Sequence, residues 1–298
     1  MNIVRTSWGF KHAQRAYVKH YTVEVLTTAD PKKKVSLTHD FNPTDLTEEK
    51  TINENTKGIC ENEEYTPKRP LLPTLIDDDK QKMPTYKSLN VSLPVFLLHN
   101  TAHIELNAID VTWHTMLLAD HLHPNSMPEQ FFKDFYKIAS DEARHFSLLC
   151  KLLEQHNSFY GALPSHGTIW KSAQLTQKSL LSRICMTQLV QESRALDSGE
   201  RLSKKFISCG DKDSAQLIET ICEEEIEHVK IGVKWFKHVL DHVLKSNETY
   251  EDAFRRLVME NYGPIPIPLN EEARTKADLP RDWYYPISRH VIKTNKKG

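Results

Sequence analysis

Two short segments place a glutamate three residues before a histidine. Glu142 and His145 lie in Asp-Glu-Ala-Arg-His, and Glu225 and His228 lie in Glu-Glu-Ile-Glu-His. Three residues turn a helix by about 300°, so each Glu and His would lie one turn apart on the same face. From that position a carboxylate and an imidazole can bind one metal ion. A single copy of this spacing occurs by chance in acidic helices and carries little weight alone.

A second repeat lies upstream of each pair. Glu105 opens the phrase Glu-Leu-Asn-Ala-Ile-Asp, and Glu192 opens Glu-Ser-Arg-Ala-Leu-Asp. The single glutamates are 87 positions apart, and the paired glutamates are 83 positions apart. We interpret this as the internal duplication of a helix pair. Four Glu and two His in this arrangement are the ligand set of a carboxylate-bridged dimetal centre in a four-helix bundle. Ordinary surface charges on four amphipathic helices are the alternative.

The predicted metal ligands form two sets, one for each ion: Glu105, Glu142 and His145, and Glu192, Glu225 and His228. Glu142 and Glu225 are expected to bridge the two ions. Unpaired buried carboxylates are costly, and two divalent ions with neutral imidazoles nearly balance four of them. Oxygen-rich ligation with one His for each ion favours two iron ions, with manganese as the alternative, over zinc or copper.

Further residues are assigned by their positions near these ligands. A ligand histidine usually donates its second N–H to a carboxylate. Asp141 and Glu224 are predicted to accept this bond, each from the other pair's histidine across the bundle. Trp113 and Gln188 lie one to two turns from a ligand glutamate and could line a substrate pocket, with core packing as an equal alternative. His103 is about 200° around the helix from the nearest ligand, so it is not expected to share a metal.

The composition excludes several classes of protein. The 298 residues carry a net charge of −1, and no basic excess indicates nucleic acid as the main partner. No apolar run reaches the roughly 18 to 20 residues that a membrane span needs. Five scattered cysteines without a Cys-x-x-Cys pair argue against a zinc ribbon, a rubredoxin-type iron site and a disulfide scaffold. The nine glycines form no phosphate-binding loop, which argues against a Rossmann domain.

The N-terminus bears on localisation. Cysteine usage favours a reducing compartment, so a cytoplasmic location is expected. Residues 1–28 carry four Lys or Arg before their first acid, Glu24. Such a basic start can be a mitochondrial transit peptide, so a mitochondrial location is the alternative. The stretch is poor in serine, however, and residues 13–25 also fit an ordinary helix.

The hydrophobic pattern predicts an all-α protein. Four long helices and a short one are expected at 91–121, 129–157, 169–208, 213–244 and 250–260. The third is so long that a kink or break is left open, and it should stop at Gly210. Three regions follow: an N-terminal region (1–88) with a helix, a polar linker at 42–68 and a proline-rich wrap at 67–84; a four-helix bundle (89–262); and an extended C-terminal tail (263–298).

Two phrases carry a family resemblance. Ala-His-Ile-Glu-Leu-Asn-Ala-Ile-Asp at 102–110 and Asp-Glu-Ala-Arg-His-Phe at 141–146 are similar to the ferritin-like di-iron carboxylate superfamily. More specifically, they resemble one uncharacterised ferritin-like family. In it a proline-rich lead-in, here 67–70, precedes the bundle, and a Leu-Asn-x-Glu-Ala-Arg phrase, here 269–274, follows it. The similarity covers about 12–285 and implies a ferritin-like four-helix bundle with N- and C-terminal extensions.

The resemblance also implies a chemistry, namely activation of dioxygen or peroxide at two irons. The leading expectation is a di-iron oxygenase or oxidase, for example a monooxygenase. It would oxidise or hydroxylate a small organic substrate or a modified nucleoside, with electrons from an unidentified donor. Two alternatives stay open: peroxide or metal detoxification, as in rubrerythrins and ferroxidases, and a metal-stabilised scaffold that binds a partner protein. No catalytic residue beyond the metal ligands is assigned, and a homodimer is left open.

Overall fold

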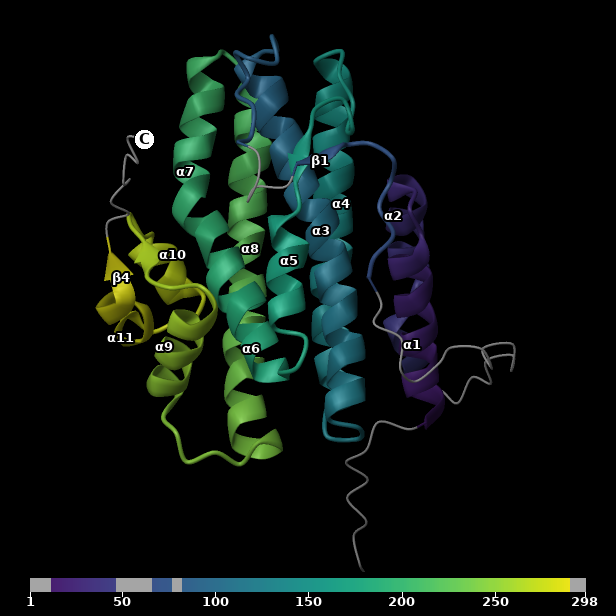
Figure 1. Cartoon of the computed structure of the whole chain (residues 1–298), viewed down its shortest axis with the longest axis vertical. Coiled ribbons are helices and arrows are strands. Elements are labelled where there is room, and N and C mark those ends of the chain that lie inside the picture. Colours follow the sequence, from purple (N-terminus) through teal and green to yellow (C-terminus); the bar gives the residue numbers. More distant parts are fainter. Residues whose placement is uncertain (1–11, 47–65, 77–81, 290–298) are drawn as a thin grey trace, which may run out of the picture. The chain divides into compact units, whose positions relative to one another are not determined.

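The computed structural model describes residues 12–46, 66–76 and 82–289, and these residues are predominantly helical (Figure 1). The all-α prediction is confirmed at this level. The chain divides into two compact units, one ending at Lys171 and one beginning at Ser172. Among the described residues, no helix combines the length and the hydrophobicity that a membrane span requires.

The first unit is built on one pair of long helices. Its elements are α1 (His12–Thr27), α2 (Pro31–Asp40), η1 (Pro43–Leu46), β1 (Leu75–Ile76), α3 (Leu93–Leu122), α4 (Glu129–Gln155) and β2 (Ser165–His166). α3 and α4 lie side by side, α2 packs on α4, and β1 pairs in parallel with β2 (Figure 1). α5 (Thr168–Leu175) begins at the end of this unit.

Local chemistry sets the ends of α3 and α4. The Ser92 side chain accepts a hydrogen bond from a backbone N–H in the first turn of α3, which satisfies a donor that a helix start leaves free. In the connection, Asn125 has a φ of 64°, a left-handed conformation that asparagine tolerates. α4 then starts directly after Pro128. The predicted helices at 91–121 and 129–157 are therefore confirmed to within two residues at each end.

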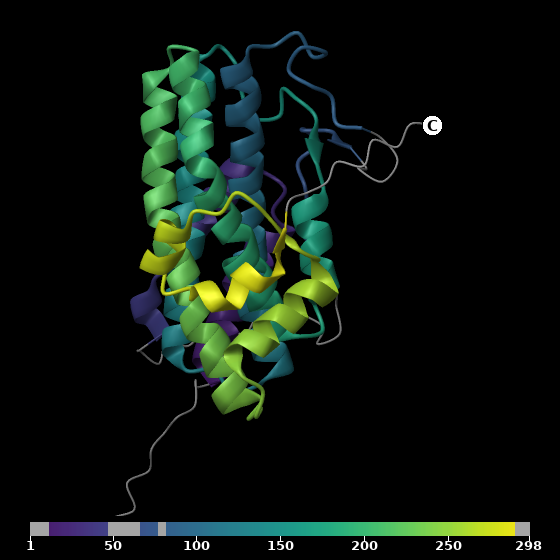
Figure 2. The same ribbon diagram turned by 90° about the vertical axis from the view of Figure 1, so that its left-hand side faces the viewer.

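The second unit contains another pair of long helices and the C-terminal segments. Its elements are α6 (Leu180–Ile184), the π-helix η3 (Cys185–Gln191), α7 (Glu192–Ser208), α8 (Lys212–His238), the π-helix η4 (Val239–Val243), α9 (Tyr250–Asn261), β3 (Ile265–Pro266), α10 (Glu271–Lys276), α11 (Arg281–Tyr284), η5 (Tyr285–Ile287) and β4 (Ser288–Arg289). α7 packs along α8, α10 contacts both, and α9 packs with α11 (Figures 1 and 2).

The single helix predicted over 169–208 is interrupted. α5 ends at Leu175, and the Ser179 side chain starts the next helix by accepting a hydrogen bond from a backbone N–H. The buried Arg183 spans the break: its Nε donates to Thr176 Oγ1 at 2.9 Å, and its Nη2 donates to a carbonyl of α5. These side-chain bonds replace part of the helical ladder. Hydrophobic periodicity does not register such a replacement, so it left the break open.

Glycines shape the second helix pair. A Cβ on Gly199 of α7 would lie 2.1 Å from Cys222 Sγ of α8, and a Cβ on Gly232 of α8 would lie 2.4 Å from Gln188 Cβ. Atoms do not approach so closely, so α8 can contact α7 and η3 as it does only with glycine at these positions. α7 ends at Ser208, just before the predicted stop at Gly210, whose φ is 78°.

The terminal regions contain more helix than the sequence predicted. α1 corresponds to the predicted helix at 13–25, and α2 follows because the Asp30 carboxylate caps its first turn. In the tail from residue 263, which was expected to be extended, the Asn270 side chain caps α10, and α11 buries Trp283. A capping side chain three residues before an apolar position is a helix signal that the many prolines of this tail obscured.

Several predictions fall wholly or partly outside the described residues. Residues 1–11, on which the mitochondrial alternative partly rests, lie outside them. So do 47–65 of the predicted linker and 77–81 of the predicted proline-rich wrap. The proposed regional boundaries after residues 88 and 262 stay predictions.

Candidate metal centre

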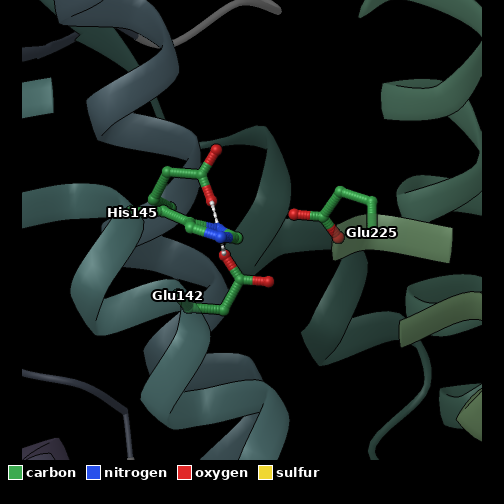
Figure 3. A group of neighbouring side chains, drawn as sticks. Glu142, His145 and Glu225 are labelled. Atoms are coloured by element: carbon green, nitrogen blue, oxygen red, sulfur yellow. Dashed lines mark ion pairs between the residues drawn. The ribbon is translucent and has the colours of Figure 1, made fainter. Parts of the chain in front are cut away.

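A carboxylate and imidazole group lies in the interior of the first unit. α3 contributes Glu105. α4 contributes Glu142 and His145 one turn apart, and both are labelled in Figure 3. His145 Nδ1 lies 3.6 Å from Glu105 Oε2 and 3.8 Å from Glu142 Oε2. The three residues offer ligand atoms within 4.8 Å of one another, and each residue is at most 5% exposed. We call these three residues the His145 triad.

The electrostatics of the His145 triad favour a cation. Burial, and next the neighbouring charge of Glu142, raises the pKa of Glu105 well above its ordinary value. Burial acts to lower the pKa of His145, but hydrogen bonds and charges from Glu105 and Glu142 outweigh it and raise this pKa to about 11. A positive charge between the two carboxylates is therefore stabilised, and either a proton on His145 or a bound metal ion can supply it.

The second unit contains a group of the same composition. Glu192 is the first residue of α7, and α8 contributes Glu225, also labelled in Figure 3, and His228. His228 Nδ1 donates to Glu225 Oε2 at 2.7 Å. The three residues again offer ligand atoms within 4.8 Å of one another. Glu225 and His228 are buried, whereas Glu192 is half-buried. We call these residues the His228 triad.

The structure thus brings together, within each unit, the three residues that the sequence assigned to one metal ion. Two helices supply each triad, one through a single glutamate and the other through Glu-x-x-His. These buried carboxylates and histidines could hold metal ions. Oxygen donors with a single imidazole nitrogen fit iron or manganese better than zinc or copper. That they do bind metal stays a prediction.

The two acids predicted to support the ligands lie beside the triads in sequence. The Asp141 carboxylate accepts hydrogen bonds from Lys137 Nζ at 2.9 Å and from Arg144 Nη2 at 3.0 Å, both on its own helix. Glu224 is half-buried on α8, next to Glu225. Their predicted hydrogen bonds to the other triad's histidine stay predictions.

The two candidate pocket residues are buried. Trp113 is 0% exposed, its Nε1 donates to Thr38 Oγ1 at 3.1 Å, and its ring packs on Phe41 and Tyr136. The structure therefore gives it a core position, the alternative that the sequence left open. Gln188 is 1% exposed within η3, and its side-chain oxygen accepts a hydrogen bond from the neighbouring threonine.

His103 is engaged by groups outside the His145 triad. The Tyr160 hydroxyl lies 2.8 Å from His103 Nδ1, and the His166 carbonyl lies 2.8 Å from Nε2. Because a carbonyl only accepts, Nε2 donates to it and Nδ1 accepts from Tyr160. Burial lowers the pKa of His103 to about 4, which keeps this ring neutral. Both nitrogens have partners, as expected for a histidine that does not share a metal.

For two buried aspartates the sequence favours hydrogen bonding to other segments over metal ligation, but it does not identify their partners. Asp110 and Asp197 close the duplicated phrases that begin at Glu105 and Glu192, and each is paired with cations from segments far away in the chain. The repetition of the aspartate in both phrases was the available signal. The partners Lys34, Arg69 and Arg274 could not be read from the sequence, because they lie 41 or more positions away from the aspartates.

Comparison with known proteins places the chain in a family. Residues 27–285 match a family described as "Protein of unknown function (DUF455)". An uncharacterised protein of Haemophilus influenzae is 27% identical over 284 residues, which cover 91% of this chain and 95% of that protein. No solved structure matches the chain. The family match includes every residue of the two triads and both buried aspartates. The chain therefore belongs to the DUF455 family.

Proposed function

We propose that the His145 triad and the His228 triad together bind two metal ions, in a ferritin-like four-helix bundle formed by α3, α4, α7 and α8. The observation that carries this proposal is the duplicated triad: within each unit, one helix pair brings a single Glu and a Glu-x-x-His together. One Glu from each of two helices and Glu-x-x-His from each of two others is the ligand pattern of dimetal carboxylate proteins.

Iron is the proposed metal, with manganese as the alternative. Two ferrous ions would supply the electrons and the open coordination positions with which dioxygen or peroxide is activated. The proposed reaction is the oxidation or hydroxylation of a small organic molecule or a modified nucleoside, with electrons from an unidentified donor. The protein's own contribution is to hold the ions, to orient them and to keep the site shielded from water.

The energetic cost of burying the ligand carboxylates supports this role. Four carboxylates would repel one another in the interior of a bundle, and apolar residues of similar size would pack there without loss of hydration. The raised pKa of Glu105 reflects this cost within one triad. A scaffold can be stable without buried carboxylates, whereas a metal centre needs them as ligands despite the energy that their burial costs. Glu142 and Glu225, each one turn from a ligand histidine, are the proposed bridging ligands.

Oxygen uptake tests the proposal. Protein prepared without oxygen, loaded with ferrous iron and analysed for metal, should consume dioxygen when exposed to air-saturated buffer. Glu192→Ala should abolish the uptake because it removes a ligand. Glu200→Ala is the matched control. This exposed glutamate lies about two turns farther along α7, and its described ion pair is with a solvent-exposed lysine. Iron-loaded protein that stays inert to both oxygen and peroxide for hours would favour the scaffold alternative.

A further inference from the structure

Each single ligand glutamate is followed five residues later by a buried aspartate. Asp110 follows Glu105 on α3, and Asp197 follows Glu192 on α7. Five residues advance a helix by about 7.5 Å and turn it by about 140°, so each aspartate lies on a different face from the ligand. Neither aspartate belongs to a triad, and both are at most 5% exposed.

In the first unit, Asp110 connects α3 to two parts of the N-terminal region. Lys34 of α2 forms an ion pair with one carboxylate oxygen, and both side chains are at most 1% exposed. Arg69, in the proline-rich phrase, approaches the other oxygen at 2.7 Å. Burial lowers the pKa of Lys34, and the charge of Asp110 opposes this effect. Two segments that are separate in the sequence therefore form ion pairs with a single carboxylate of α3.

In the second unit, Asp197 connects α7 to the C-terminal tail. Arg274 Nε and Nη2 donate to the two carboxylate oxygens at 3.0 and 2.8 Å, and both side chains are fully buried. The Asn270 N–H also donates to Asp197, at 2.8 Å. Arg194, on α7 itself, donates at 2.9 Å to Asp197 and at 2.6 Å to the carbonyl of Pro266. The Leu-Asn-x-Glu-Ala-Arg phrase is thus fixed to the helix that carries Glu192.

Stability alone does not account for two such arrangements. A buried ion pair loses hydration, and apolar residues of similar volume often stabilise a fold as well or better. A buried ion pair fixes the position of its two side chains, because any shift of the carboxylate leaves a buried charge without its partner. Bidentate contact with arginine adds directionality to this constraint. In both units the constraint acts on the helix that supplies the single ligand glutamate.

We propose that Asp110 and Asp197 are positioning residues that set the rotation and height of α3 and α7, and thereby the places of Glu105 and Glu192. This inference rests on the proposed dimetal function. A carboxylate oxygen lies roughly 6 Å from its helix axis, so a rotation of about 20° moves it by about 2 Å. Metal–ligand distances tolerate only about 0.2 Å. A small error in the setting of either helix is therefore enough to weaken metal binding.

Two arginine-to-lysine variants of the full chain test the proposal. Arg274→Lys keeps the charge but replaces the bidentate contact by a single ammonium. Arg69→Lys keeps the charge in the first unit but changes the geometry of the contact with Asp110, at a side chain that is 19% exposed, so it is the milder variant should the first fail to fold. Arg281→Lys is the matched control, because it alters an exposed pair with Glu271 on the same tail. Metal-free proteins, checked by circular dichroism, are titrated with Co²⁺ and followed by visible absorption.

The proposal expects a Co²⁺ dissociation constant about tenfold or more above wild type in Arg274→Lys or Arg69→Lys, together with an altered spectrum of the bound ion. Arg281→Lys should match wild type in both. Lower thermal stability with wild-type affinity and spectrum would show that the aspartates only hold the extensions, and would overturn the proposal. Wild-type protein that binds no Co²⁺ would instead contradict the dimetal function itself.

Discussion

The two triads contain the same residue types but lie in different helical settings. Glu105 lies in the interior of α3, an uninterrupted helix of 30 residues. Glu192 lies where the π-helix η3 passes into α7, and it is half-buried rather than buried. His145 Nδ1 lies 3.6 and 3.8 Å from two carboxylates, whereas His228 Nδ1 donates at 2.7 Å to one carboxylate of its own helix.

From this difference we infer that the two triads would bind metal with different strength. π-Helical turns are uncommon and occur frequently at functional sites. A ligand at the end of such a turn can adjust more readily than one held inside a regular helix. We therefore expect the His145 triad to bind its ion more tightly, and coordination to change more readily around Glu192.

The largest expected effect comes from removing a histidine. His145→Ala or His228→Ala should raise the metal dissociation constant by about 100-fold or more, since loss of a supporting hydrogen bond alone costs about 10- to 100-fold. Metal analysis after dialysis measures the loss. His103→Ala is the control, because this buried histidine of α3 is bonded to groups outside the triad. Equal metal content in all three variants would contradict the ligand assignment.

The next prediction concerns the stability of the packing between α7 and α8. Gly199→Ala should destabilise the protein by about 1–3 kcal/mol, because its Cβ would lie 2.1 Å from Cys222 Sγ. Adding Cys222→Ala should recover much of this loss, which denaturant unfolding can measure. No glycine occurs in α3 or α4, so the packing of the first pair does not depend on glycine in this way. A neutral Gly199→Ala variant would show that α7 and α8 lie farther apart.

A matched pair of ligand changes tests the comparison itself. Glu105→Gln should weaken metal binding about tenfold more than Glu192→Gln, because the buried and rigid ligand has no means of adjustment. Calorimetric titration with Mn²⁺ gives both dissociation constants. Equal losses, or a larger loss for Glu192→Gln, would remove the proposed difference between the two triads.

The finest measurement counts a single proton, the one that His145 releases when metal binds. The pKa of His145 in the metal-free protein is about 11, so at pH 7 the ring carries a proton that metal must displace. Affinity should therefore rise with pH, by about tenfold per unit from this proton alone, until the pH reaches that pKa. Titration in buffers of different ionisation enthalpy counts the protons released. His145→Gln should release about one proton fewer, and an unchanged count would contradict the assignment.

The sequence predicted the parts of the site that depend on local spacing. Glu142 and His145 are one turn apart because three residues separate them, and the ends of α4 follow from Pro128 and the last apolar positions. The duplication identified Glu105 and Glu192 without a structure. Long-range partners were beyond this reasoning: nothing near Asp197 in the sequence indicates that Arg274 binds it.

The position of the break before α6, which the sequence left open, was not predicted for a different reason. Arg183 and Thr176 replace the helical ladder with side-chain bonds, and an apolar periodicity does not register such a replacement. The tail helices were missed because prolines dominate that region, although Asn270 is a regular N-terminal cap. In both places, individual polar side chains decided the backbone conformation.

The account rests on the claim that the two triads form one dimetal centre. Electron paramagnetic resonance of Mn²⁺-loaded protein tests it most directly, because two ions bridged by carboxylates are magnetically coupled. We predict two Mn²⁺ per chain and a coupled spectrum, which His145→Ala or His228→Ala should convert into the signal of an isolated ion or abolish. Two uncoupled ions in the wild type, or none at all, would contradict the account.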